Sequence, residues 1–466
     1  MPQKRTFDKL AIDNVDEFVF GTCKYPVTTK KGIVIGGGDV VPECKFTLPA
    51  IELYEEGGLD KAYTIYRNTA HGIVDRAGQL HVPSDTGVQL EYETTVEFTM
   101  NPEWGAEVNR ILLEEMEWGY QEYGLKSSLR MTVNDNREFE RPPRMRDGKN
   151  WDDMMQLVDQ STKDGADMIS IESTGGKEVS DDAIVRGDLQ KYIFALGVMA
   201  PYDMERLWDS IVEICEANGA IPAGDSSCGF GNTAMVLAEK GFVSRMFSAV
   251  ARVCCVPRAL VAFERGAQGP DKDCEYADPY IKAITGSPIS MEGRTACGAH
   301  LSQVGNIAEA VCDVWSNESI QYIRLLSDMA PTVHMEQLIY DVRQCNVRKD
   351  LKDKIWYRDL LVDSDCYNDP QAWVLRPDVV IRTAGGIIKE TEPLKRTKAA
   401  AQLTIDELRK AVADGNLQAT KRDTKWLDRM EKQLSKIPDD PEEFWEQIKP
   451  SLDLDTFRPA DYGLKV

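Results

Sequence analysis

From about residue 86 the sequence alternates between short apolar segments and amphipathic helical segments, and this alternation constrains the fold more than any other feature. VQLEYETT at 88–95 has the pattern of a strand, and Asn101 followed by Pro102 can start a helix that ends near Gly124. Further strands are expected, in chain order, at KSSLRMTV, ADMISIES, AIPAGDSS and ALVAFE, with helices between them. Repeated strand–helix units predict parallel strands, because a helical crossover returns the chain to the same end of the sheet.

A parallel sheet of this kind is either open and doubly wound or closed into a barrel. The Gly36-Gly37-Gly38 run lacks the GxGxxG spacing of a dinucleotide site, and we interpret it as a turn. No glycine-rich phosphate turn follows the first expected strand, which favours an α/β (β/α)8 TIM-type barrel. We expect three parts: an N-terminal extension at 1–85 packed on the barrel, the barrel at 86–400, and a C-terminal helical layer at 401–466.

The charge and hydropathy of the chain exclude two classes of partner. With 55 Lys and Arg against 77 Asp and Glu, the net charge of −22 makes nucleic-acid binding unfavourable. The longest apolar neighbourhood, 247–263, is interrupted by Arg252, Pro257 and Arg258, so it is shorter than the roughly 20 apolar residues that a bilayer requires. The first residues lack the apolar core of a secretory signal, so we expect a cytoplasmic protein with no membrane partner.

Eleven cysteines are present, and in a cytosolic chain we expect them to be reduced thiols. Most of them lie in apolar helical contexts and are interpreted as small core residues. There is no CxxC, HExxH or GxxxxGK[ST] motif, and only four histidines are available as ligands. Zinc ribbons, zincins and P-loop nucleotide sites are therefore not indicated.

Three segments share one design, in which a reactive side chain follows a strand and lies next to glycine or polar residues. They are GADMISIESTGGKE with Glu172, AIPAGDSSCGFGNT with Cys228, and GPDKDCEYADPYIKAITGSPISMEG with Cys274. In a parallel barrel, residues that follow the strands face one mouth of the barrel, where active sites form. One carboxylate and two thiolates would suit zinc with an open fourth position, the pattern of a catalytic site. Taken singly, a cysteine beside glycine is more often a packed residue, and a glutamate at a strand end is more often a solvated carboxylate.

The motifs IESTGGKE, CGFGNTAMVLAEKG, KDCEYADPYIKAITGSPISMEG and NPEWGAEV resemble the zinc subunit of the methanol:corrinoid methyltransferases of methanogens and acetogens. The likeness extends from FGTCKYPV near the start to the C-terminal helices. It implies a (β/α)8 barrel with added helices. It also implies one zinc per chain, with Glu172, Cys228 and Cys274 as metal ligands and catalytic residues.

The resemblance further implies an activity and a partner. The methyl group of methanol would pass to the Co(I) corrinoid of a separate corrinoid-binding protein, with zinc acting as a Lewis acid on the alcohol oxygen. The expected assembly is a homodimer of heterodimers, in which each heterodimer consists of this chain and one corrinoid-binding protein. The alternatives are a different methyl donor, such as a methoxylated compound, or a zinc-binding scaffold without catalysis.

Two finer expectations concern the surroundings of the site. Glu93 and Asp225 follow or end neighbouring strands, so either could supply a proton to the leaving oxygen, although each could equally be a structural carboxylate. The loop at 265–280, with Lys272 and Asp273, is expected to form part of the rim on which the partner docks.

Overall fold

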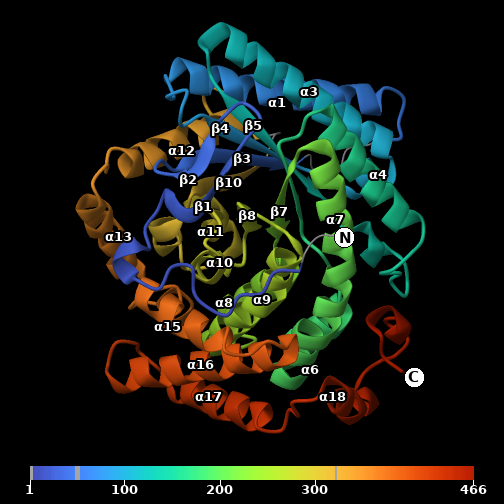
Figure 1. Ribbon diagram of the computed structural model, residues 1–466, viewed down its shortest axis with the longest axis vertical. Helices are drawn as coiled ribbons and strands as arrows, with labels where there is room; N and C mark the ends of the chain where they lie inside the picture. The colour runs from blue at the N-terminus through green and yellow to red at the C-terminus, as the bar shows by residue number, and fades with distance from the viewer. Residues whose placement is uncertain (1–3, 48–52, 321–322, 466) are drawn as a thin grey trace.

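The computed structural model describes residues 4–47, 53–320 and 323–465, and in it eight parallel strands form a nearly closed barrel surrounded by helices (Figure 1). The barrel strands are β3 (Val41–Thr47), β4 (Val88–Glu93), β5 (Ser127–Val133), β6 (Met168–Ile171), β7 (Ile221–Asp225), β8 (Asp271–Asp273), β9 (Ile289–Glu292) and β10 (Val314–Ile320). They follow one another around the barrel in chain order, because β3 pairs with both β4 and β10. The predicted (β/α)8 class is confirmed.

The barrel closes between β7 and β8. The segment just before β8 bonds to β7, with the backbone amide of Gly269 donating to the carbonyl of Ala223 at 2.8 Å. A Cβ atom on Gly224 would overlap the carboxylate of Asp271. Glycine at this position therefore lets the two strands approach each other.

Helices connect successive strands and form the outer ring. The long ones are α1 (Gly58–Gln79), α3 (Pro102–Tyr123), α4 (Lys149–Asp164), α7 (Ala200–Asn218), α9 (Arg245–Arg265) and α12 (Ala330–Asn346). The shorter ones are α2 (Val96–Met100), α5 (Lys177–Arg186), α6 (Leu189–Phe194), α8 (Cys228–Glu239), α10 (Asp278–Thr285) and α11 (Arg294–His300). Helix α3 ends at Gly124 in a left-handed conformation, φ 68°, as its sequence predicts.

Helix α9 differs from the sequence prediction. ALVAFE was expected to be a strand, but it forms the second half of this helix, and the strand of that unit is the short β8. Buried residues occupy almost every position of α9, so the helical periodicity that would identify it is absent. In the described part of the chain, α9 is the one helix long and apolar enough for a membrane span, but that stretch is wholly buried in the protein, the setting of a core helix.

The start of the barrel lies earlier in the chain than expected. Strand β3 and helix α1 belong to the barrel, yet both lie within the segment 1–85. Strand β3 (VPECKFT) is buried at six of its seven positions, so it lacks the alternating pattern that identifies a half-buried strand. A true extension remains before it: the hairpin of β1 (Thr22–Thr28) and β2 (Val34–Gly37) covers the end of the barrel where the strands begin.

The stretch from Asn306 to Trp315 has a sequence pattern that predicts a helix, but the structure differs there. A short 3-10 helix at Ile307–Val311 is followed at once by β10, the last barrel strand. Strand β10 carries Asn317 and Glu318 among its central residues, and its polar composition conceals it in the sequence.

The expected C-terminal helical layer is present. It consists of α13 (Leu351–Asp365), α14 (Pro370–Trp373), α15 (Pro377–Ile387), α16 (Pro393–Ala413), α17 (Lys421–Leu434) and α18 (Pro441–Ile448). Helix α16 packs on α9, and these orange and red helices cover one side of the barrel (Figure 1). The layer begins at α13, so the expected boundary at 400/401 falls inside α16. The division into three domains stays a prediction.

Candidate metal centre at the barrel mouth

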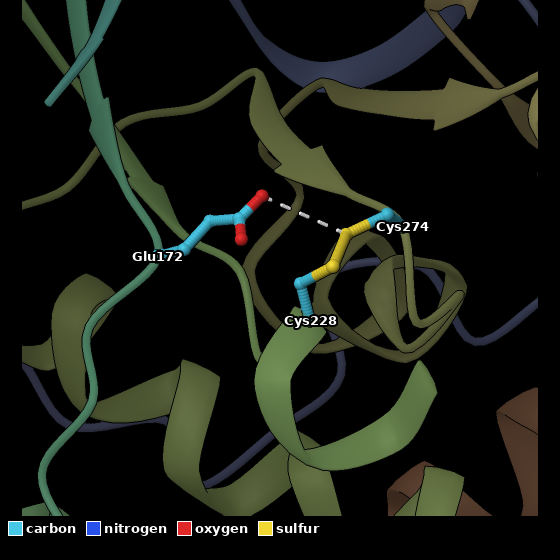
Figure 2. A group of neighbouring side chains, drawn as sticks. All are labelled: Glu172, Cys228 and Cys274. Carbon is cyan, nitrogen blue, oxygen red and sulfur yellow. Dashed lines mark hydrogen bonds between the residues drawn. A yellow bond between two sulfur atoms is a disulfide. The ribbon is translucent and has the colours of Figure 1, made fainter. Parts of the chain in front are cut away.

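The structure brings Glu172, Cys228 and Cys274 together at the mouth of the barrel where the strands end (Figure 2). Glu172 directly follows β6, Cys228 is the first residue of α8, and Cys274 directly follows β8. One oxygen of Glu172 and the two sulfur atoms all lie within 4.8 Å of one another. The three segments therefore converge as the barrel geometry predicts.

Cys228 and Cys274 are joined by a disulfide in this structure (Figure 2), with their Cα atoms 5.5 Å apart. The expectation of reduced thiols does not hold for this pair, whereas the other nine cysteines are free. The physical reason is that both side chains point to the same place, so their sulfur atoms meet. The same convergence is what a shared metal ion requires.

Two polar side chains contact the sulfur atoms. Asn232 lies one helical turn after Cys228 and donates from Nδ2 to its Sγ at 2.9 Å. Ser226 Oγ lies 3.4 Å from Cys274 Sγ and donates to the carboxylate of Glu275 at 2.9 Å. Asn232 was not predicted as a site residue, although its position four residues after Cys228 in CGFGN is the spacing that places two side chains on one helix face.

The position of Cys228 at the start of the twelve-residue helix α8 also matters. The amino terminus of a helix carries a partial positive charge, which stabilises a thiolate over a thiol. A hydrogen bond from Asn232 acts in the same direction. Local structure thus favours the anionic form of Cys228 once it is reduced.

Lys272 is the second residue that the sequence analysis did not place in the site. Its side chain is 1% exposed, and Nζ contacts the carboxylate of Glu172 and lies 3.2 Å from Glu93 Oε2. Lys272 lies two residues before Cys274, at the end of the same strand. Its charge alone suggested a surface residue. A buried ammonium here balances carboxylates that would otherwise repel one another.

The two candidate proton donors have different surroundings: burial raises the pKa of Asp225, whereas the pKa of Glu93 is lowered. Burial would raise the pKa of Glu93, but Lys272 and Lys45 outweigh it and hold that pKa at about 2, so Glu93 is ionised. Asp225 is fully buried, where it accepts a hydrogen bond from Trp208 Nε1 at 2.8 Å and pairs with Arg258 at 3.2 Å. These contacts make Asp225 a structural carboxylate that holds the end of β7.

The expected docking rim at 265–280 is wrong for most of its length. From Gly269 onward the described side chains are buried, and Lys272 points into the mouth instead of out to solvent. The side chain of Asp273 lies outside the described part of the structure. The polar composition of this loop reflects internal ion pairs, which a sequence pattern does not distinguish from a solvated surface.

A cavity of about 100 Å³ adjoins the three-residue group. Its lining includes Glu93, Glu172, Asn134, Gly229 and Phe230. Since one water occupies about 30 Å³ in the liquid, this space holds a molecule of only a few heavy atoms. Of the three-residue group, Glu172 lines this small polar cavity, and Gly229, which follows Cys228, lines it as well.

Comparison with known proteins places this chain in a family. Residues 4–463 match the family described as methanol-cobalamin methyltransferase B subunit. A methanol–corrinoid protein co-methyltransferase from Methanosarcina barkeri is 34% identical over 99% of this chain and 100% of its own length. The crystal structure of the methanol:cobalamin methyltransferase complex MtaBC from the same organism superposes with a TM-score of 0.93, again over 99% of this chain. The chain belongs to the methanol-cobalamin methyltransferase B subunit family, as its motifs predict.

Proposed function

We propose that this protein transfers the methyl group of methanol to the Co(I) corrinoid of a partner protein, using zinc held by Glu172, Cys228 and Cys274. The observation that carries the proposal is the convergence of these three ligand types within 4.8 Å at the barrel mouth. It occurs in a chain that shares family, fold and 34% identity with a methanol–corrinoid protein co-methyltransferase.

The donor set suits zinc. Two thiolates and one carboxylate are all zinc ligands, and three protein ligands leave a fourth position for a substrate. Both cysteines must be thiolates for this role, so the disulfide has to be reduced before metal binds. When bound, zinc supplies Lewis acidity to the alcohol oxygen, whose departure is otherwise the difficult part of the reaction.

The residues of the chain would prepare and orient the site. Asn232 and the start of α8 favour the thiolate of Cys228. Lys272 fixes the carboxylate of Glu172 at the cavity edge through its contact with one oxygen. In the reaction, the carbon–oxygen bond of methanol breaks and the electron pair of Co(I) forms the bond to the methyl group, which leaves cobalt as Co(III). The hydroxide takes up a proton from solvent and leaves as water. The partner would have to bring its cobalt over this mouth, and the complex MtaBC is the precedent.

The size of the cavity favours methanol over a methoxylated aromatic donor. Pockets for larger ligands usually measure roughly 300–1,000 Å³. The cavity beside Glu172 is about 100 Å³, which suits methanol and is smaller than the usual pocket for an aromatic ligand. We also expect a cytoplasmic location and a dimer of the two-protein unit.

The decisive assay supplies reduced, zinc-loaded protein with a Co(I) corrinoid protein and either methanol or a methoxyaromatic compound. Methylcobalt formation, followed by its visible absorption, is expected with methanol alone. Turnover of the methoxyaromatic compound without any on methanol would favour the other donor class. Zinc binding without turnover of either, in the presence of a competent corrinoid protein, would favour the scaffold hypothesis.

A further inference from the structure

A second group of possible ligands lies at the same mouth. Glu292 ends β9, Glu318 lies on β10, and His300 is the last residue of α11. One ligand atom from each lies within 4.8 Å of the other two. His300 Nδ1 is 3.9 Å from Glu292 Oε2, and Nε2 is 3.8 Å from Glu318 Oε2. Strand β10 is opposite β6 in the barrel order, so this group faces Glu172 from the far side.

Glu292 is the most informative member. It is 1% exposed, and within the described residues neither of its carboxylate oxygens accepts a hydrogen bond. Its nearest cation is Lys45, whose Nζ lies 3.9 Å from Oε1. Nδ1 of His300 likewise has no hydrogen-bond partner in the part of the chain that the structure covers. Buried polar atoms normally have partners, so these atoms indicate a ligand.

The excess of carboxylates over lysines around the group also favours binding of a cation. Lys45 lies 2.5 Å from Glu93, 3.3 Å from Glu318 and 3.9 Å from Glu292, so one ammonium group serves three carboxylates. Its closest contact is with Glu93, which leaves Glu292 and Glu318 with weaker compensation.

The backbone after His300 supports a positioned side chain. Leu301 at φ 56° and Gln303 at φ 48° both adopt the left-handed conformation, which residues other than glycine rarely adopt. Such strain persists only where surrounding contacts impose it, and it is frequent at binding sites. Here it reverses the chain directly after α11 and leaves His300 facing β9 and β10.

We propose that Glu292, His300 and Glu318 bind a divalent cation, separate from the group at Glu172. One imidazole nitrogen and two carboxylates, without sulfur, suit ions such as Mn²⁺ better than thiophilic ions. Ligand atoms on one ion at about 2 Å lie roughly 3–3.5 Å apart, so side-chain rotations have to close gaps of up to 4.8 Å around one imidazole nitrogen. The ion would compensate the excess carboxylates beside Lys45. This proposal does not depend on methanol being the substrate or on zinc at the first site.

The test is a titration of the metal-free, full-length protein with Mn²⁺ alone, followed by electron paramagnetic resonance. We expect about one tightly bound Mn²⁺ per chain, with a spin-echo modulation from a coordinated histidine nitrogen. His300→Ala should abolish that modulation, and both His300→Ala and Glu318→Gln should weaken binding by at least about tenfold. Cys228→Ser should bind Mn²⁺ like the wild type, which separates this site from the zinc proposal.

His334→Ala is the matched control, because this histidine is half-buried on α12, outside the group. Circular dichroism and thermal melts establish that each variant is folded. Absence of Mn²⁺ binding by the wild type at millimolar concentration would overturn the proposal. So would equal binding by His300→Ala and Glu318→Gln, or loss of binding in Cys228→Ser.

Discussion

The interior of the barrel and its mouth use the same kinds of charged residue in different ways. In the interior, Arg130 and Glu43 are fully buried and bonded at 2.7 Å, and Ser290 donates to the other oxygen of Glu43 at 3.0 Å. Arg130 also donates to Ser170 and to the carbonyl of Pro270. Both oxygens of the buried carboxylate are thus satisfied within the protein.

At the mouth, carboxylates outnumber lysines and are incompletely satisfied. Lys45 and Lys272 face five of them: Glu91, Glu93, Glu172, Glu292 and Glu318. Among the described residues, one oxygen of Glu91 and both of Glu292 accept no hydrogen bond. Paired charge in the interior specifies structure, whereas surplus negative charge at the mouth is suited to binding cations. Substitution should therefore affect mainly stability in the interior and mainly activity and metal binding at the mouth.

The largest effect is expected on activity, at the mouth. Cys274→Ser removes a thiolate ligand from the proposed zinc site, so methyl transfer from methanol should fall by at least about a thousandfold, since Lewis-acid activation is worth several kcal/mol. The rate of methylcobalt formation, followed by stopped-flow absorption, measures this decrease. Cys23→Ser, a free cysteine at the opposite end of the barrel, is the control and should retain activity. Equal rates for the two variants would remove Cys274 from the mechanism.

The largest effect on stability is expected in the interior. Arg130→Met leaves Glu43 buried without its charge partner, and breaking such a pair costs about 3–5 kcal/mol of unfolding free energy. Urea denaturation of the folded variant at neutral pH measures this loss. A change below about 1 kcal/mol would mean that the interior pair does not hold the barrel together as described.

Acid should reveal the contribution of Glu93. Burial would raise the pKa of Glu93, but Lys272 and Lys45 hold it at about 2 in the folded protein. Because that pKa is below the unfolded value, the stabilisation is complete above about pH 4.5 and is lost as the pH falls toward 2. Between pH 4.5 and 2, the free energy of unfolding of Glu93→Gln should therefore decrease by roughly 2 kcal/mol less than that of the wild type. An equal loss of unfolding free energy in the variant and the wild type over this pH range would contradict this.

The smallest effect is expected for Glu318→Gln in metal-free protein. Lys45 lowers the pKa of Glu318 in spite of burial, so the negative charge of Glu318 is net stabilising, and Glu318→Gln should lose stability, by less than about 1 kcal/mol. Thermal melts with chelator and with Mn²⁺ give the comparison. A loss as large as that of Arg130→Met would erase the distinction between the interior and the mouth.

The sequence predicted the barrel and the convergence of Glu172, Cys228 and Cys274, because strand–helix alternation and strand-end positions are local features. It missed β3 and the helical second half of α9, where full burial removes the periodic pattern. It also misjudged Lys272, since a buried ion pair and a surface charge have the same sequence signature. The group of Glu292, His300 and Glu318 depends on contacts between separate elements, which no spacing in the chain reveals.

The central claim is that Cys228 and Cys274 act as zinc thiolates beside Glu172. X-ray absorption at the zinc edge of active, reduced protein tests it most directly. We predict about one zinc per chain with two sulfur ligands at about 2.3 Å and oxygen ligands at about 2.0–2.2 Å, and one sulfur fewer in Cys228→Ser. Active protein whose zinc has only oxygen and nitrogen ligands, or whose Cys228 and Cys274 stay joined in a disulfide during turnover, would contradict the account.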